Sequence, residues 1–413
     1  MNTFGASVSI IDKFAQHFKG LFSKTQLAVF NTLLYAFIND YKRVNLSSLA
    51  KGIHIDYDQL QYFVSDSKWS YEALNTKRIE LLRNQRTTGF SRDGLLIIDD
   101  TGVLKPYAPK TEGVAYQHCP VLGEEALCNV AVASCLAVNK RYIPLALKFY
   151  KTQDEFIMGK NDPDFKSKLE LAQELIADAL NKKVPFRYVL FDAWYSASDV
   201  LNYIQEQNLF FISEVKSDRK AYFRNPEARK SYFMQQDEMV TLIKRYLWHK
   251  VKTFKYRDEQ LAVYSFKSRL KSTDFPVKVF VVISITSGET RTVITNDLSL
   301  SEKKAILTYL ERWAIERCFR ELKDTLYFDH YQVRRLPKIM RYWMLVITVW
   351  SLLYWIRQNG YLFRSISSSL KGKSINECKQ ALLKLIIFSS YEALRKKDAP
   401  YKNIEYRKKN HAG

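Results

Sequence analysis

Two short runs of branched apolar residues, each ending in an acid, constrain the fold of this chain more than any other feature. The first run is GLLIIDD and ends at Asp100, and the second is RYVLFD and ends at Asp192. Compact apolar runs of this length predict strands that are buried on both faces. A carboxylate at the end of such a strand lies at the edge of a sheet, where ligands bind in open α/β folds. Either acid alone also suits a solvated loop or a helix cap.

Further strand-like and helical segments accompany these two runs. The segments NVAVASCLAV and YIPLALKFY predict two strands that turn near Asn139 and Lys140, and LFFISEV, VKVFVVISI and TRTVITN predict three more. Amphipathic helices are expected over residues 165–181 and 198–207. Strands mixed with helices in this order indicate an α/β fold with a mixed sheet.

A long helix is predicted from Ser301 through Lys323, and it carries a spaced set of polar residues. Tyr309, Arg312, Glu316 and Lys323 follow the pattern Tyr-x2-Arg-x3-Glu-x6-Lys. On a period of about 3.6 residues, Arg312 and Glu316 share a face, and Lys323 falls near it two turns later. A carboxylate flanked by cations suits a metal held beside a phosphate chain. The same spacing also suits a salt-bridged surface helix.

The charge balance favours a polyanionic partner. The 413 residues include 64 Lys and Arg against 43 Asp and Glu, which gives a net charge of +21. Because neutralising phosphates releases counterions, an excess of this size makes nucleic acid the leading candidate. Hydrophobic residues make up 47% of the chain, which excludes a disordered protein and supports two or three packed domains.

The first ninety residues are predicted to form helices with short polar breaks. Leu46 and Leu49 lie on one short helix, the break runs from Gly52 to Asp56, and Leu60 and Phe63 lie on the next helix. Two short helices joined by a tight turn are typical of a helix-turn-helix motif, whose second helix reads DNA. Any small helical bundle shows the same pattern, so base contacts from residues 58–68 are a hypothesis.

From Leu95 to Arg335 the sequence resembles the DDE transposases of bacterial insertion sequences, specifically the insertion-sequence-4 superfamily, whose signature is the Tyr-Arg-Glu-Lys helix. The resemblance rests on IIDDTG around the first acid, LFDAWYSASDVL around the second, and TNDLSLSEKKAILTYLERWAIERCFRELKDTL around the third. It implies an α/β, RNase H-like catalytic domain with a mixed sheet and an inserted β-rich segment. It also implies a helical DNA-binding domain at the N-terminus.

The resemblance implies that two aspartates and one glutamate hold two Mg²⁺ ions, for which Mn²⁺ can substitute. Asp100, Asp192 and Glu316 match these catalytic and metal-binding positions. Asp99 competes with Asp100, which is preferred because Thr follows it directly. Carboxylate oxygens are ligands that Mg²⁺ favours, so three acids suffice. Two such cations serve phosphodiester cleavage by activating an attacking oxygen and stabilising the leaving one.

The resemblance also assigns DNA contacts. Arg312 and Lys323 match residues that bind phosphates of the transposon end, and Tyr309 matches one near the cleaved strand. Some relatives excise through a hairpin and flip a base onto a Trp of the inserted segment. The inserted segment here offers Trp248 alone, at an uncertain position, which puts that route in doubt.

Two aromatic residues follow the second acid directly. Trp194 and Tyr195 come after Asp192 and either stack on DNA or pack in the core under the next helix. Both interpretations stay open at this point.

The sequence suggests five regions. They are a helical DNA-binding domain (1–90), the first part of the catalytic core (91–215), an insertion (216–275), the second part of the core with the glutamate helix (276–345), and a helical region with a basic tail (346–413). The N-terminal residues MNTFGASVSIIDKFAQHF lack the basic start and apolar core of a signal peptide. The longest apolar stretch is too short to span a bilayer, and the five cysteines predict no disulfide framework. We therefore expect a bacterial cytoplasmic protein without a membrane partner.

The expected function is that of a transposase, which binds terminal inverted repeats, cuts at the element ends and joins them to target DNA. Joining two ends implies at least a homodimer on the paired DNA. An RNase H-like nuclease without strand transfer and a catalytically idle, transposase-derived DNA-binding protein are the alternatives. The three acids favour the active enzyme over the idle protein.

Overall fold

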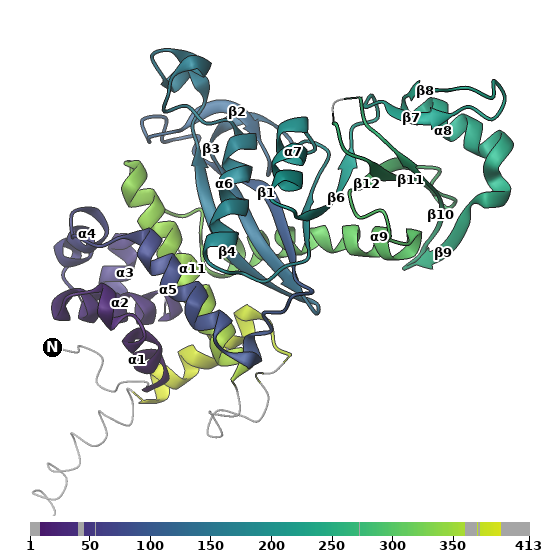
Figure 1. The fold of residues 1–413 in the computed structure, drawn as a ribbon. Helices are drawn as coiled ribbons and strands as arrows, with labels where there is room; N and C mark the ends of the chain where they lie inside the picture. Colours follow the sequence, from purple (N-terminus) through teal and green to yellow (C-terminus); the bar gives the residue numbers. More distant parts are fainter. Residues whose placement is uncertain are drawn as a thin grey trace, which may run out of the picture. The chain divides into compact units, whose positions relative to one another are not determined.

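The computed structural model describes residues 9–39, 45–53, 55–271, 273–359, 370 and 372–389. The chain divides into two compact units. The helical unit comprises Met1–Gly89, Lys110–Glu112 and Phe319–Gly413, and the sheet unit comprises Phe90–Pro109 and Gly113–Cys318. Figure 1 colours both along the sequence. The basic residues at 395–397 and 407–409 lie outside the described residues.

The helical unit combines described helices from the N-terminal and C-terminal regions of the sequence. Its helices are α1 (Ser9–Gln16), α2 (Lys24–Asn39), α3 (Leu46–Ile53), α4 (Tyr57–Ser65), α5 (Tyr71–Arg83) and α11 (Leu336–Gln358). The Arg341 side chain on α11 donates hydrogen bonds to the carbonyl oxygens of Val64, Ser67 and Trp69. Arg78 on α5 donates a hydrogen bond to the hydroxyl of Ser351 on α11 at 3.0 Å, so described residues of the separately expected parts 1–90 and 346–413 pack in one unit.

Helix α11 is the central helix of this unit. Its 23 residues are long and apolar enough to cross a membrane by length and composition, but 94% of its apolar window is buried in the protein. Trp343 and Trp350 are among the largest buried side chains. The helix is longer than the apolar stretch that the sequence shows, and its burial identifies it as a core helix of this unit.

The sheet unit is built on one large mixed sheet. Its strands are β1 (Leu95–Leu104), β2 (Ala115–Cys119), β3 (Glu124–Val138), β4 (Arg141–Tyr150), β5 (Tyr188–Phe191), β6 (Phe210–Val215), β9 (Lys252–Tyr256), β10 (Glu259–Ser268), β11 (Val277–Ser284) and β12 (Thr290–Thr295). The order is β2-β3-β1-β5-β6-β12-β11-β10-β9, with β4 paired to β3. The strands β1, β5 and β6 are parallel, and β3 is antiparallel to β1. This α/β sheet is consistent with the RNase H-like core that the resemblance implies.

Helices flank the sheet. The helices α6 (Lys168–Asn181) and α7 (Ser198–Glu206) pack beside each other, α6 against β1, β3 and β4 and α7 against β6 (Figure 1). Ser167 caps α6 through a capping box with Glu170, which explains where the helix begins. The predicted turn between β3 and β4 is confirmed, since Asn139 and Lys140 both have positive φ.

The segment expected as an insertion continues the main sheet. Strand β10 pairs with β11, and β9 pairs with β10. A separate two-stranded sheet of β7 (Ala221–Arg224) and β8 (Ser231–Met234), followed by α8 (Gln236–Leu242), precedes them. Glu302 fixes β9 and β10 to α9 (Glu302–Leu310), because its carboxylate accepts hydrogen bonds from Lys252 and Ser265.

Two predicted elements have different bounds in the structure. Strand β1 continues to Leu104, so Asp99 and Asp100 lie within the strand and not at its end. The strand is longer than predicted because Thr101 and Val103 are β-branched, buried and paired with β3. The long helix is divided into α9, a 3₁₀ turn at Glu311–Trp313, α10 (Ala314–Arg320) and a π-helical turn at Glu321–Thr325. The uniform 3.6-residue period therefore does not hold over its whole length.

Candidate active site

The acid after the second predicted strand lies where the sequence places it. Asp192 directly follows β5. Its carboxylate accepts hydrogen bonds from the backbone nitrogens of Trp194, at 2.9 Å, and Tyr195, at 3.3 Å. These bonds fix the start of the loop that leads to α7, and they orient the carboxylate.

The two adjacent aspartates of β1 make different contacts. Successive side chains of a strand point to opposite faces of the sheet, so Asp99 and Asp100 diverge. Asp100 forms an ion pair with Lys168, at the start of α6. Asp99 forms an ion pair with Arg312, in the turn after α9, at 3.1 Å. The sequence preferred Asp100, and the structure shows that the two acids have different partners across the fold.

The strand register places Asp99 level with Asp192. Parallel pairing of β1 with β5 aligns Leu95 with Tyr188 and Ile97 with Leu190. Continuing this register by two residues brings Asp99 opposite Asp192 on the same face of the sheet.

Burial raises the pKa of Asp99 to about 7; the Arg312 charge opposes this shift, and the carboxylates of Asp192 and Asp100 add to it. The influence of Asp192 on Asp99 agrees with the register.

Arg312 connects the third predicted acid to this pair. Its guanidinium lies 3.1 Å from Asp99 and 3.6 Å from Glu316, and its side chain is 14% exposed. Burial acts to lower the pKa of Arg312, but Tyr309 and the charges of Asp99, Asp192 and Glu316 outweigh it and raise the pKa. Arg312 therefore pairs with two carboxylates and lies within electrostatic reach of a third, that of Asp192.

Tyr309 and Lys323 are the other two predicted site residues. Tyr309 is 4% exposed, and its hydroxyl donates to the carboxylate of Glu214 on β6 at 3.2 Å. Lys323 belongs to the π-helical turn in the helical unit, and Glu316 belongs to the sheet unit. The contacts of both residues with DNA stay predictions.

Two further residues join the site that the sequence did not single out. They are Lys168, which pairs with Asp100, and Glu214, which accepts a hydrogen bond from Tyr309. Glu214 had a detectable signal, since it is the one charged residue in the mostly apolar strand segment LFFISEV. Lys168 had none, because a lysine in the first turn of a helix is unremarkable by itself.

Tyr195 is a buried residue within electrostatic reach of the aspartates. It is 1% exposed, and its hydroxyl has no hydrogen-bond partner in the part of the chain that the structure describes. Burial raises the pKa of Tyr195 well above its usual value, and the charges of Asp100, Asp99 and Asp192 add to this shift. A buried donor without a partner beside several carboxylates suits a site that an oxygen-bearing ligand completes.

The acid set fits a hard divalent cation in its chemistry. Among the described residues, no three His, Cys, Asp or Glu side chains stand as a ready metal site. Two of the three aspartates are instead neutralised by Arg312 and Lys168. The ligands are oxygens without thiols or imidazoles, and the mutual repulsion of the carboxylates is what a cation would relieve.

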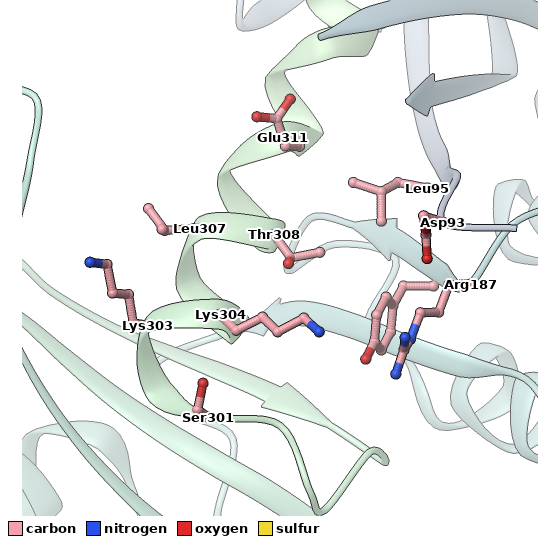
Figure 2. A pocket seen from close by; sticks show the side chains of 10 residues that line it. Asp93, Leu95, Arg187, Ser301, Lys303, Lys304, Leu307, Thr308 and Glu311 are labelled. Atoms are coloured by element: carbon pink, nitrogen blue, oxygen red, sulfur yellow. The ribbon is translucent and has the colours of Figure 1, made fainter. Parts of the chain in front are cut away.

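A separate cavity of about 600 Å³ lies beside α9, and it contains none of the predicted acids. Figure 2 shows its lining, in which the amine of Lys304 points toward Arg187. Glu311 lines this cavity, while the guanidinium of its neighbour Arg312 pairs with Asp99 and Glu316. The candidate chemistry thus lies outside the cavity, at the carboxylates.

Two protein families match this chain, and the matched ranges together include all the candidate acids. Residues 14–239 match the family described as DDE superfamily endonuclease, and residues 164–352 match the family described as transposase DDE domain. The first match includes Asp99, Asp100 and Asp192, and the second includes Asp192 and Glu316.

A probable transposase for insertion sequence element IS701, from Microchaete diplosiphon, is 31% identical over 216 residues. The aligned region covers 51% of this chain and 55% of that relative, so the chain matches about half of the relative's length.

Proposed function

Because the chain belongs to the DDE superfamily endonucleases, we propose that it is the transposase of an insertion sequence. It binds the terminal inverted repeats of its element, cleaves the DNA at the ends and joins the 3′-OH ends to target DNA. The observation that carries this proposal is the grouping of Asp99, Asp192 and Glu316 around Arg312. The Tyr-x2-Arg-x3-Glu-x6-Lys spacing supports membership of the insertion-sequence-4 superfamily.

The catalytic acids in this proposal are Asp99, Asp192 and Glu316. The sequence preferred Asp100 as the first acid. The strand register and the contact with Arg312 favour Asp99 instead. These carboxylates would hold two Mg²⁺ ions, or Mn²⁺ in their place. When bound, the ions supply positive charge that activates an attacking oxygen and stabilises the leaving oxygen.

Arg312 contributes a cation of the chain itself to the site. It presents a planar fork that can bind a phosphate in bidentate fashion, and Asp99 and Glu316 hold the fork in place. For Lys323 the support is the sequence resemblance, by which it binds another phosphate of the transposon end. Tyr309 positions the backbone of the cleaved strand, and Glu214 orients its hydroxyl.

The helical unit supplies end recognition in this proposal. Helices α3 and α4 form the two members of a helix-turn-helix, and α4 exposes Tyr57 at 43% and Tyr62 at 61%. Asp56 caps α4 by accepting from the backbone nitrogen of Asp58, which fixes the start of the candidate recognition helix. A homodimer would pair two ends, and the protein would act in the bacterial cytoplasm.

Strand transfer separates this proposal from its runner-up, an RNase H-like nuclease. The test uses the DNA that flanks the reading frame, searched for inverted repeats, as a labelled substrate with Mg²⁺ and a target plasmid. A transposase gives cut ends that are covalently joined to the plasmid. Cut ends without joined product would identify a nuclease, and binding without cutting would identify an idle DNA-binding protein.

A further inference from the structure

We propose that Trp194 and Lys168 form a binding subsite for an unpaired nucleotide of DNA, at the edge of the sheet beside Asp192 and Asp100. The indole of Trp194 stacks on the base, and the ammonium of Lys168 binds the adjoining phosphate. The inference rests on the proposed function for its ligand, DNA.

Trp194 has the exposure of a binding residue. Its side chain is 47% exposed, whereas the neighbouring Tyr195 is 1% exposed. Of the two alternatives for these aromatic residues, Tyr195 therefore packs in the core, and Trp194 is open to solvent and free to stack on a ligand. A large apolar ring left open next to candidate catalytic acids is more informative than one on a remote surface.

Trp194 is also held in place. Its backbone nitrogen donates to the Asp192 carboxylate at 2.9 Å, and its ring meets that of Tyr195 edge to face at 4.8 Å. A ring that is already fixed loses little conformational entropy when a base stacks on it. The same hydrogen bond ties the position of the ring to that of the acid.

Lys168 supplies the charge. Its ammonium contacts the Asp100 carboxylate and lies 5.3 Å from the ring centre of Tyr150 and 5.5 Å from that of Trp194. The side chain is only 12% exposed, so salt screens it less than a surface lysine. An ammonium has three donors, and the contact with Asp100 leaves others for a phosphate oxygen.

The combination selects an unpaired nucleotide. A base inside a duplex is stacked on both sides and cannot cover an indole, whereas an unpaired base offers a free face. Stacking on an aromatic side chain accepts any base, because every base has a π-face. A phosphate next to the base brings the negative charge that Lys168 can neutralise.

A purely structural role makes a different prediction. Lys168 could serve only to fix α6 to β1, and Trp194 could serve only to shield that ion pair. On this alternative, substitutions would change the melting temperature without any preference for unpaired DNA.

The test measures binding of the full-length protein to labelled duplexes in EDTA, where no divalent ion supports cutting. One probe is a blunt duplex, and the other is the same duplex with a short single-stranded thymidine tail. Trp194→Ala should weaken binding of the tailed probe about fivefold or more and leave the blunt probe unchanged. Trp194→Phe should restore most of the loss. Tyr116→Ala, which removes an aromatic side chain that is 69% exposed on β2, is the matched control and should behave as wild type.

The charge is tested separately. Lys168→Gln should weaken binding of the tailed probe and reduce the slope of log affinity against log salt by about one. The control Lys166→Gln removes a lysine that is 51% exposed and paired with Glu174, and it should leave the slope unchanged. Equal loss on tailed and blunt probes for Trp194→Ala would overturn the inference, as would a Lys168→Gln variant that changes only the melting temperature.

These outcomes are independent of cleavage. If wild-type protein cuts element ends and Trp194→Ala weakens binding of the tailed probe no more than binding of the blunt probe, the inference fails and the proposed function stands. If Trp194 discriminates the probes and no cutting occurs with Mg²⁺, the proposed function fails and the subsite remains.

Discussion

The guanidinium of Arg312 lies 3.1 Å from the carboxylate of Asp99, although 213 positions separate the two residues in the sequence. The same guanidinium is 3.6 Å from Glu316, one helical turn further along. A strand residue and a helix residue that carry opposite charges are thus joined in a largely buried site. Three of our predictions concern this arrangement.

Arg312→Ala should slow DNA cleavage by about 1.5–3 kcal/mol, because it removes charge-assisted bonds to a phosphate. Arg312→Lys should recover part of the rate, since an ammonium keeps the charge and loses the fork. Single-turnover cleavage of a labelled element end, run beside thermal melts, measures both. Arg320→Ala removes an exposed arginine at the end of α10 and is the control. Wild-type rates from Arg312→Ala would refute the phosphate role.

The two adjacent aspartates should differ in effect. Asp99→Asn should reduce cleavage at least about 100-fold, because it removes a carboxylate that shares the face of Asp192. Asp100→Asn should slow the reaction about tenfold or less, since its carboxylate pairs with Lys168 on the other face. Cleavage rates of the two variants at saturating DNA compare them. The reverse ranking would restore Asp100 as the ligand that the sequence preferred.

How far the sequence predicts this site depends on the element. Asp192 was predictable, because its strand is a short apolar run that ends at the acid, and the structure ends β5 at Phe191. The sequence distinguished Asp99 from Asp100 less well, because both lie in one strand and differ mainly in their partners across the fold. Thr101 and Val103 extended that strand beyond the predicted end.

The glutamate helix shows a second limit. The spacing of Arg312 and Glu316 predicted one shared face, and their 3.6 Å ion pair agrees. The position of Lys323 assumed an unbroken period, but a π-helical turn begins at Glu321. Local hydrogen-bond irregularities of this kind are set by tertiary packing, and the residue pattern does not encode them.

The anchoring of the inserted strands should depend on pH. Burial alone acts to raise the pKa of Glu302, but hydrogen bonds from Lys252, its own backbone nitrogen and Ser265 outweigh it and lower the pKa from 4.5 to about 2. A carboxyl whose pKa falls on folding stabilises the protein above pH 4.5, and this contribution disappears as the pH falls toward 2.

Glu302→Gln should therefore lower the free energy of unfolding at neutral pH by about 1–2 kcal/mol, a value discounted for the exposure of Lys252. It should also flatten the acid limb of stability against pH. Denaturant melts between about pH 3 and 7 give both quantities, because carboxyl groups ordinarily titrate within this range. Glu289→Gln, at a carboxylate that is 67% exposed, is the control. An unchanged acid limb in Glu302→Gln would contradict this assignment.

End recognition should reside on α4. Gln61 and Tyr62 lie on its exposed side, and a glutamine can bind an adenine edge in the major groove. Gln61→Ala should reduce the preference of the full-length protein for its terminal repeat over random duplex by about 1–3 kcal/mol. Competition binding measures this ratio, and Thr76→Ala on the exposed side of α5 is the control. A ratio equal to wild type would leave α3 and α4 as packing helices only.

The most direct test of the account is Mg²⁺-dependent cleavage of the element's own ends by wild-type protein, Asp192→Asn and Glu316→Gln, with DNA binding measured on the same samples. Wild type should cut at the ends only when Mg²⁺ is present. Both variants should bind the DNA with nearly wild-type affinity and lose at least about 100-fold in cleavage, because affinity rests on many phosphate contacts and chemistry on the acids. Cleavage by either variant at the wild-type rate would contradict the proposed active site.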